Sequence, residues 1–122
     1  MAKTIMIVDD SASIRQVVTI ALKGAGYDVV EACDGKDALS KLTGQKINLI
    51  ITDVNMPNMD GITFVQEAKK LAAYKFTPMM MLTTETAGDK KQAGKDAGAK
   101  AWLTKPFQAP TLLDAVAKLV LP

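Results

Sequence analysis

Histidine is absent from this chain of 122 residues, and cysteine occurs once, as Cys33. The first absence excludes catalytic triads and general-base chemistry that depend on histidine. The second excludes a disulfide within the chain, and we interpret Cys33 as a small buried apolar residue. Aromatic residues make up only 5% of the chain, and the formal net charge is +2. No basic run is interleaved with aromatics, so nothing indicates binding to nucleic acid.

Long apolar segments are also missing. No stretch approaches the ~20 apolar residues of a membrane span. The chain begins with Met1-Ala2-Lys3 and enters a short apolar run directly, without the apolar region and cleavage site of a signal peptide. We therefore expect a cytoplasmic protein that has no membrane segment. With 48% hydrophobic residues, the chain is long enough for one core and too short for two, so residues 1–122 are expected to form one domain without an attached output domain.

Short apolar runs alternate with longer amphipathic stretches along the whole sequence. The runs predict strands buried on both faces. The predicted strands are Thr4–Val8, Asp28–Glu31, Leu49–Thr52, Pro78–Leu82 and Ala101–Leu103. This alternation predicts a flavodoxin-like (βα)5 fold, a doubly wound parallel five-stranded sheet with strand order 2-1-3-4-5.

Five helices are expected between and after these strands. The first has its apolar stripe at Ile14, Val17, Val18, Ala21, Leu22 and Ala25, with Ser11 or Ser13 as the cap and Gly26 at its end. The second runs from the Asp34 cap to Gly44, the third follows Asp60-Gly61 and buries residues as far as Leu71 and Ala72, and the last begins near Pro110. The fourth, at 87–97, contains Gly88 and Gly94 and is expected to be the loosest helix.

Acidic residues and one lysine follow these strands where each strand ends. Asp9 and Asp10 follow the first strand, Asp53 the third and Lys105 the fifth. Because the carboxyl ends of parallel strands meet at one edge, these side chains are expected to form one pocket. Such a group of carboxylates suits Mg²⁺, which prefers oxygen ligands. The simpler interpretation makes them helix caps and a surface lysine, but it does not explain why all of them fall at one edge.

The same residues suggest a reaction. A carboxylate can attack phosphorus and form an aspartyl phosphate while Mg²⁺ and a lysine neutralise the phosphoryl oxygens. Asp53, at the end of a central strand, is the candidate nucleophile, and Lys105 is expected to pair with it at rest. Thr83 adds a hydroxyl at this edge, although a helix cap is the simpler role for it. A phosphohistidine donor would have to belong to another protein, because this chain has no histidine.

The chain resembles the receiver domains of two-component response regulators, and among these the single-domain CheY-like chemotaxis proteins. The similarity extends from end to end. The motifs that carry it are Val8-Asp9-Asp10-Ser11, Asp34-Gly35, residues 52–61 (Thr-Asp-Val-Asn-Met-Pro-Asn-Met-Asp-Gly), Leu82-Thr83-Thr84 and Lys105-Pro106-Phe107.

The resemblance implies a role for each matching residue. It implies that Asp53 is the phosphoacceptor, and that Mg²⁺ is held by Asp10, Asp53 and the backbone carbonyl of Asn55, with Asp9 acting through water. Thr83 and Lys105 would contact the phosphoryl group, with Lys105-Pro106 as a cis peptide. Thr83 and Trp102 would take part in the switch. The rate of dephosphorylation would be tuned by Asn55, Thr84 and Glu85.

The resemblance also implies partners. A CheA-like histidine kinase would donate the phosphoryl group, and the face made by the fourth helix, fifth strand and fifth helix would bind a target, with the protein itself a monomer. Trp102 stands where such families often have tyrosine, and Ser11 is smaller than the aromatic residue of the best-known chemotaxis proteins. Three alternatives for the target therefore stay open. The protein could bind a flagellar motor switch protein, bind a partner in a non-flagellar pathway, or bind no target and serve as a phosphate sink.

Three other functions fit the sequence less well. An FMN-binding module would need a hydroxyl- and glycine-rich loop after the first strand, where Asp9 and Asp10 would repel a phosphate. A haloacid-dehalogenase-like phosphatase has a second aspartate two residues after its nucleophile, where this chain has Asn55. A degenerate receiver would lack one of the required groups, and all are present. We therefore expect a signalling phosphoacceptor rather than an enzyme acting on a separate substrate.

Overall fold

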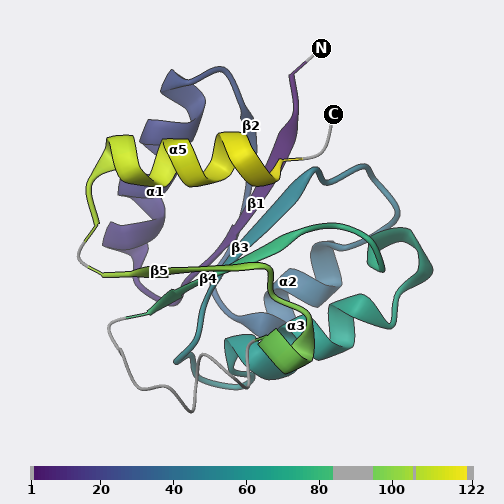
Figure 1. The fold of residues 1–122 in the computed structure, drawn as a ribbon. Coiled ribbons are helices and arrows are strands. Elements are labelled where there is room, and N and C mark those ends of the chain that lie inside the picture. The colour runs from purple at the N-terminus through teal and green to yellow at the C-terminus, as the bar shows by residue number, and fades with distance from the viewer. Residues whose placement is uncertain (1, 84–94, 106, 121–122) are drawn as a thin grey trace.

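The computed structural model describes residues 2–83, 95–105 and 107–120. In these ranges five parallel strands form one sheet with the order β2-β1-β3-β4-β5, which confirms the predicted fold class. Helices α1 and α5 cover one face of the sheet, and α2 and α3 cover the other (Figure 1). The strands are β1 (Thr4–Val8), β2 (Asp28–Ala32), β3 (Leu49–Asp53), β4 (Met79–Thr83) and β5 (Ala101–Thr104). The helices are α1 (Ala12–Gly24), α2 (Gly35–Lys41), α3 (Gly61–Lys69), the short 3₁₀ helix η1 (Ala72–Tyr74) and α5 (Ala109–Leu119).

The strand boundaries differ from the predicted ones by one residue at most. Strands β2, β3 and β5 each end one residue later than predicted, and β4 is displaced by one residue, to Met79–Thr83. Most of the predicted fourth helix lies outside the described residues, and residues 95–97 of it are helical. Among the described helices, none is long and apolar enough to cross a bilayer.

Local side-chain caps explain where the helices begin. The Ser11 hydroxyl accepts a hydrogen bond from the Ile14 amide at 3.3 Å at the start of α1, and Asp34 caps α2 through the Asp37 amide at 2.8 Å. Both satisfy an amide that has no partner inside its helix. Gly26 has a φ of 94°, the left-handed conformation that favours glycine after a helix. The predicted cap at Asp34 is confirmed, and Ser11 rather than Ser13 caps α1.

Alternate residues of the central strands enter two separate cores. Ile5 and Ile7 pack with Leu22 on the α1 and α5 side, whereas Met6 and Val8 pack with Phe64 on the α2 and α3 side. The three consecutive methionines of β4 (79–81) are fully buried, which confirms that they fill the core. This arrangement explains why the sequence of these strands is continuously apolar rather than alternating.

Some predicted core positions are wrong. Leu71 is 38% exposed and Ala72 is exposed, because α3 ends at Lys69 and the chain turns into η1 before either residue can face the sheet. Val17 belongs to the predicted α1 stripe but is 56% exposed, so the buried stripe is narrower and includes Val18 and Leu22. Cys33 is exposed as well, because it lies in the turn between β2 and α2.

A close backbone approach fixes the entry into α3. A Cβ atom at Gly61 would overlap the Asp53 carbonyl oxygen, and because this is a backbone atom, no change of side-chain conformation could remove the overlap. The Gly61 amide also donates to the Val54 carbonyl at 2.8 Å. The loop after β3 is therefore folded back against the end of the strand that carries Asp53, and only glycine permits this.

Replacing Gly61 by alanine should therefore destabilise the protein, by about 1–3 kcal/mol for the overpacked backbone. Gly24→Ala is the matched control, since a Cβ atom at Gly24 would have no neighbour within 4 Å and alanine favours a helix. Urea unfolding of both variants measures the difference. Equal midpoints for Gly61→Ala and the unmodified chain would show that the approach is not rigid.

Candidate functional site

The register of the sheet aligns the ends of four strands. Val8 lies opposite Thr52, Asp53 opposite Leu82, and Thr83 opposite Thr104. The residues at and after these strand ends therefore share the carboxyl edge of the sheet, where ligands bind in open α/β folds. The Lys105 amide donates to the Thr83 carbonyl at 2.7 Å, which extends the alignment one residue beyond β5.

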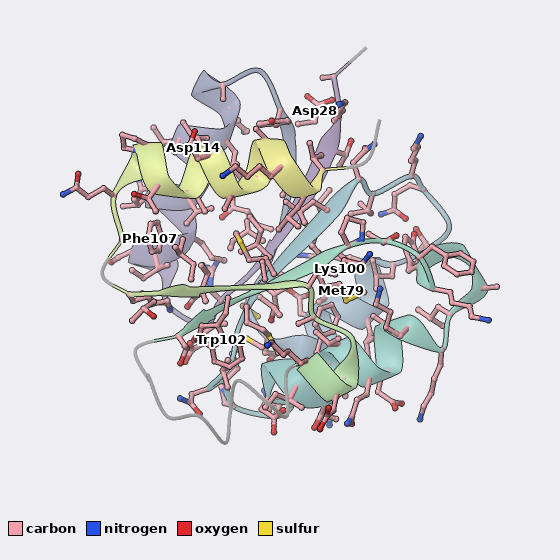
Figure 2. The ribbon with its side chains drawn as sticks, in the orientation of Figure 1. Asp28, Met79, Lys100, Trp102, Phe107 and Asp114 are labelled. Atoms are coloured by element: carbon pink, nitrogen blue, oxygen red, sulfur yellow. The ribbon has the colours of Figure 1, made fainter. Side chains whose placement is uncertain are left out.

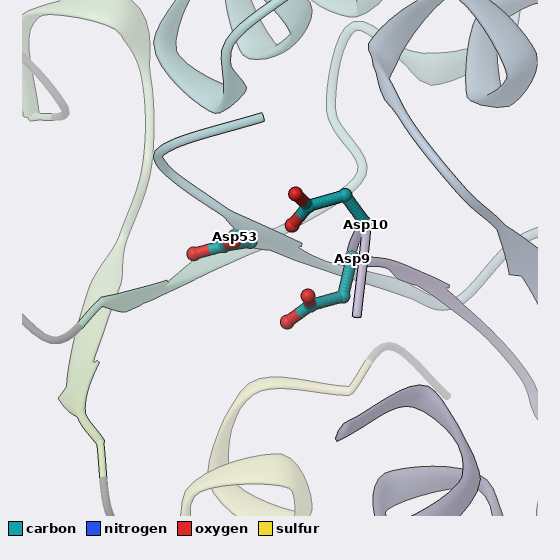
Figure 3. A group of neighbouring side chains, drawn as sticks. All are labelled: Asp9, Asp10 and Asp53. Carbon is teal, nitrogen blue, oxygen red and sulfur yellow. The ribbon is translucent and has the colours of Figure 1, made fainter. Parts of the chain in front are cut away.

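Three carboxylates converge at this edge (Figure 3). Each of Asp9, Asp10 and Asp53 offers an oxygen atom, and these atoms lie within 4.8 Å of one another. Asp9 is fully buried and Asp53 is 7% exposed, whereas Asp10 is exposed to solvent. The donor set is hard oxygen with one open side, which fits a divalent cation that keeps some of its water. The three carboxylates among the predicted metal ligands are thus brought together.

Lys105 supplies the cation of the cluster. Its Nζ lies 2.8 Å from Asp9 Oδ2 and 3.4 Å from Asp53 Oδ1, and its side chain is 12% exposed. The predicted ion pair with Asp53 is present, but the shorter one is with Asp9. Since Asp9 is the most buried of the three acids, its charge has the greatest need of a partner. Nothing in the sequence distinguishes the two aspartates as partners of Lys105.

The environment of Asp53 raises the pKa of its carboxyl group. Burial is the main cause, and the charge of Asp9 raises the pKa further. The Lys105 ammonium and the Val54 amide, which donates to Asp53 Oδ1 at 2.9 Å, act in the opposite direction. The Asp53 carboxyl is therefore buried close to another negative charge, and a bound cation would favour its ionised form.

Two contacts that support the acids were not predicted. Arg15 on α1 donates from Nη1 to the Asp9 carbonyl at 2.5 Å, and the Ser11 amide donates to Asp9 Oδ1 at 2.9 Å. The position of Arg15, one turn into the helix that follows the acid pair, was the signal available in the sequence. Together the two contacts fix both the backbone and one carboxylate oxygen of Asp9.

A further unpredicted contact joins two loops near the site. Asn58 has a φ of 67° and donates from Nδ2 to Asp34 Oδ2 at 2.8 Å, which ties the loop after β3 to the cap of α2. The hydrogen bonds from the Asp37 amide, Asn58 and the Lys36 amide lower the pKa of Asp34. No spacing in the sequence indicates this pair, because it joins residues on separate loops.

The other predicted site residues lie as follows. Thr83 is fully buried at the end of β4, and Asn55 is exposed two residues after Asp53. Trp102 is half-buried on β5 and packs on the α2 and α3 side, whereas Phe107 packs on the other side (Figure 2). The buried Trp102 Nε1 has no hydrogen-bond partner in the described structure. Thr84, Glu85 and Pro106 lie outside the described residues.

Known proteins resemble the chain over nearly its whole length. Residues 5–117 match the family model of the response regulator receiver domain. Protein PilG of Pseudomonas aeruginosa is 38% identical over 92% of this chain and 83% of its own length. The alkaline phosphatase synthesis transcriptional regulatory protein PhoP of Bacillus subtilis is 38% identical over 99% of this chain. The matched region is 49% of the length of PhoP, so this chain spans about half of that relative.

Solved structures give the same answer. The chemotaxis protein CheY4 of Vibrio cholerae is 48% identical, with a TM-score of 0.95 over 98% of this chain and 100% of that chain. A CheY-like receiver domain protein from Methanospirillum hungatei is 28% identical, with a TM-score of 0.90 over 97% of this chain and 93% of that chain. With the aspartates and Lys105 arranged at the carboxyl edge of a five-stranded sheet, the chain belongs to the receiver domain family of two-component response regulators and is CheY-like.

Proposed function

We propose that the chain accepts a phosphoryl group from a histidine kinase onto Asp53 in a Mg²⁺-dependent reaction. The observation that carries this proposal is the convergence of Asp9, Asp10 and Asp53 with the Lys105 ammonium. In the transfer, an Asp53 oxygen forms the new P–O bond while the P–N bond to the donor's histidine breaks. The electron pair of that bond stays with the imidazole nitrogen, so no base within this chain is needed.

The residues of the site divide this work. Asp10, Asp53 and the Asn55 carbonyl would hold Mg²⁺, with Asp9 acting through water, and the bound ion would neutralise phosphoryl oxygens. Lys105 is already within 3.4 Å of Asp53 and would pair with a phosphoryl oxygen after transfer. Thr83, buried at the same edge, would supply a hydroxyl to that group. We assign the tuning of dephosphorylation to Asn55, Thr84 and Glu85.

We further propose that phosphorylation changes the face formed by the predicted helix at 87–97, β5 and α5, and that the protein acts in chemotaxis signalling. The similarity to the chemotaxis protein CheY4 supports the pathway. A CheA-like kinase is then the donor and a flagellar motor switch protein is the first candidate target. Trp102 in place of tyrosine favours the second candidate, a target in a non-flagellar pathway.

The phosphoacceptor is tested by incubating the full chain with Mg²⁺ and a small phosphodonor such as acetyl phosphate. Intact mass spectrometry should show one added phosphoryl group, none in Asp53→Asn, and a rate lowered roughly 100-fold in Lys105→Met, which lacks one stabilising cation. Asp28→Asn, at the other end of the sheet, is the control and should react normally. An undiminished adduct in Asp53→Asn would refute the assignment.

Mg²⁺ should stabilise the protein against heating. A ligand that binds only the folded state adds about 2.7 kcal/mol when its free concentration is about 100 times Kd. We expect a rise in Tm with Mg²⁺ that is largely lost in Asp10→Ala and retained in Asp28→Asn, measured by differential scanning calorimetry. A rise of equal size in Asp10→Ala would place the bound ion elsewhere.

Trp102 should report the switch, because it is the only tryptophan and its indole Nε1 is buried without a partner in the described structure. Its emission should shift when Mg²⁺ and beryllofluoride occupy the site, since a change in burial alters the polarity around the ring. Thr83→Ala should reduce that shift while leaving Mg²⁺ binding intact. An unchanged spectrum with the site occupied would remove Trp102 from the switch.

A further inference from the structure

Phe76 is an unusual surface residue. Its side chain is 80% exposed, more than Ile20 at 64% or Val17 at 56%, and the Lys75 ammonium lies 5.6 Å from its ring centroid. A single exposed apolar residue is ordinary on a soluble protein. The exposure of Phe76 alone therefore does not identify a binding site.

A groove lies beside the Phe76 ring. A cavity of about 290 Å³ lies between the 44–47 segment and the 72–77 segment, with Ile47, Ala72 and Ala73 along its walls and Phe76 at its edge. We call this cavity the Phe76 groove. It has the size of a small ligand pocket or of one large side chain with its neighbours. An apolar side chain entering it would meet Ala72, Ala73 and Phe76, which all line the cavity.

The walls of the Phe76 groove are held in place from below. The Tyr74 hydroxyl accepts from the Gly44 amide at 2.9 Å and donates to the Gln45 carbonyl at 2.9 Å, and Tyr74 is only 2% exposed. On the other wall, Lys69 Nζ donates to the Thr77 carbonyl at 2.7 Å. A partner would therefore meet a formed groove and would not have to order it on binding.

The charge beside the groove is mainly positive. Segments 43–48 and 68–77 contain four lysines and no acidic residue. These lysines are Lys46, Lys69, Lys70 and Lys75. The nearest acid in sequence, Glu67, is paired with Lys70 at 2.7 Å. With Glu67 included, these segments still have three more positive than negative side chains, in a chain whose net charge is only +2. This excess favours a negatively charged partner.

We infer that the Phe76 groove binds an acidic peptide segment of a partner protein, with one large apolar side chain in the groove and carboxylates facing Lys46 and Lys75. A protein segment fits better than nucleic acid or a membrane, because the site combines apolar wall residues with a few lysines and is not a broad basic face. The contact is between a buried apolar anchor and a charged rim, the usual anatomy of a protein interface.

The position of the groove determines its regulation. It lies where the chain enters β3 and β4, whereas the carboxylates lie at the opposite ends of the strands, so the two sites face opposite edges of the sheet (Figure 1). No residue of the groove belongs to the acidic cluster. Binding at the groove is therefore independent of phosphorylation and would hold the protein near a partner in both of its states.

The test is a titration of the ¹⁵N-labelled full chain with peptides of about ten residues, rich in Asp and Glu and carrying one Phe, Leu or Trp. Amide shifts should concentrate in 43–48 and 71–77, with a Kd below about 1 mM. Peptides with lysine in place of the acids, or serine in place of the apolar residue, are the controls. Beryllofluoride with Mg²⁺ should leave the affinity unchanged.

Variants make the result specific. Phe76→Ser, and separately Lys46→Glu with Lys75→Glu, should weaken peptide binding about tenfold or more. Ile20→Ser removes an exposed apolar side chain from α1 and should have no effect. The inference is overturned if no shifts appear in these segments at about 1 mM peptide, if Phe76→Ser binds normally, or if anionic phosphatidylglycerol vesicles or duplex DNA shift these residues while the peptides do not.

Discussion

The ion pair between Lys105 and Asp9 is the contact on which the site depends. Asp9 is fully buried and Lys105 is 12% exposed, so neither charge is well solvated by water. A buried carboxylate without a partner is strongly destabilising, and here two further carboxylates stand within 4.8 Å of it. Lys105 offsets part of this concentrated negative charge. The same ammonium is near enough to Asp53 to take part in chemistry there.

The sheet supplies the precision that this arrangement needs. The three acids and the lysine come from three strands, and one parallel register brings them to the same edge. The loop after β3 is fixed by the close approach of Gly61 to the Asp53 carbonyl and by the Asn58 contact with Asp34. The site lies on strand ends and on loops that are held in place by these contacts, so it is preorganised. Stabilising a phosphoryl group during transfer requires such preorganisation.

The part of the structure that depends on periodicity and strand ends was predictable from sequence. Apolar runs predicted all five strands to within one residue, and the parallel order of those strands predicted that Asp9, Asp53 and Lys105 lie together. The predictions that Leu71 and Cys33 are buried were wrong, because apolar character does not indicate where a helix ends or which side of a turn faces solvent. The choice of Asp9 as the closest partner of Lys105 depends on relative burial, which requires the three-dimensional structure.

The role of Lys105 and Asp53 is tested most directly by a crystal structure of the full chain with Mg²⁺ and beryllofluoride. We predict beryllium bonded to an Asp53 carboxylate oxygen, Mg²⁺ held by Asp10 and Asp53, and Lys105 Nζ moved from Asp9 toward a fluoride. A beryllofluoride group bound away from Asp53, or bound to Asp53 with Lys105 still on Asp9 alone, would contradict this prediction.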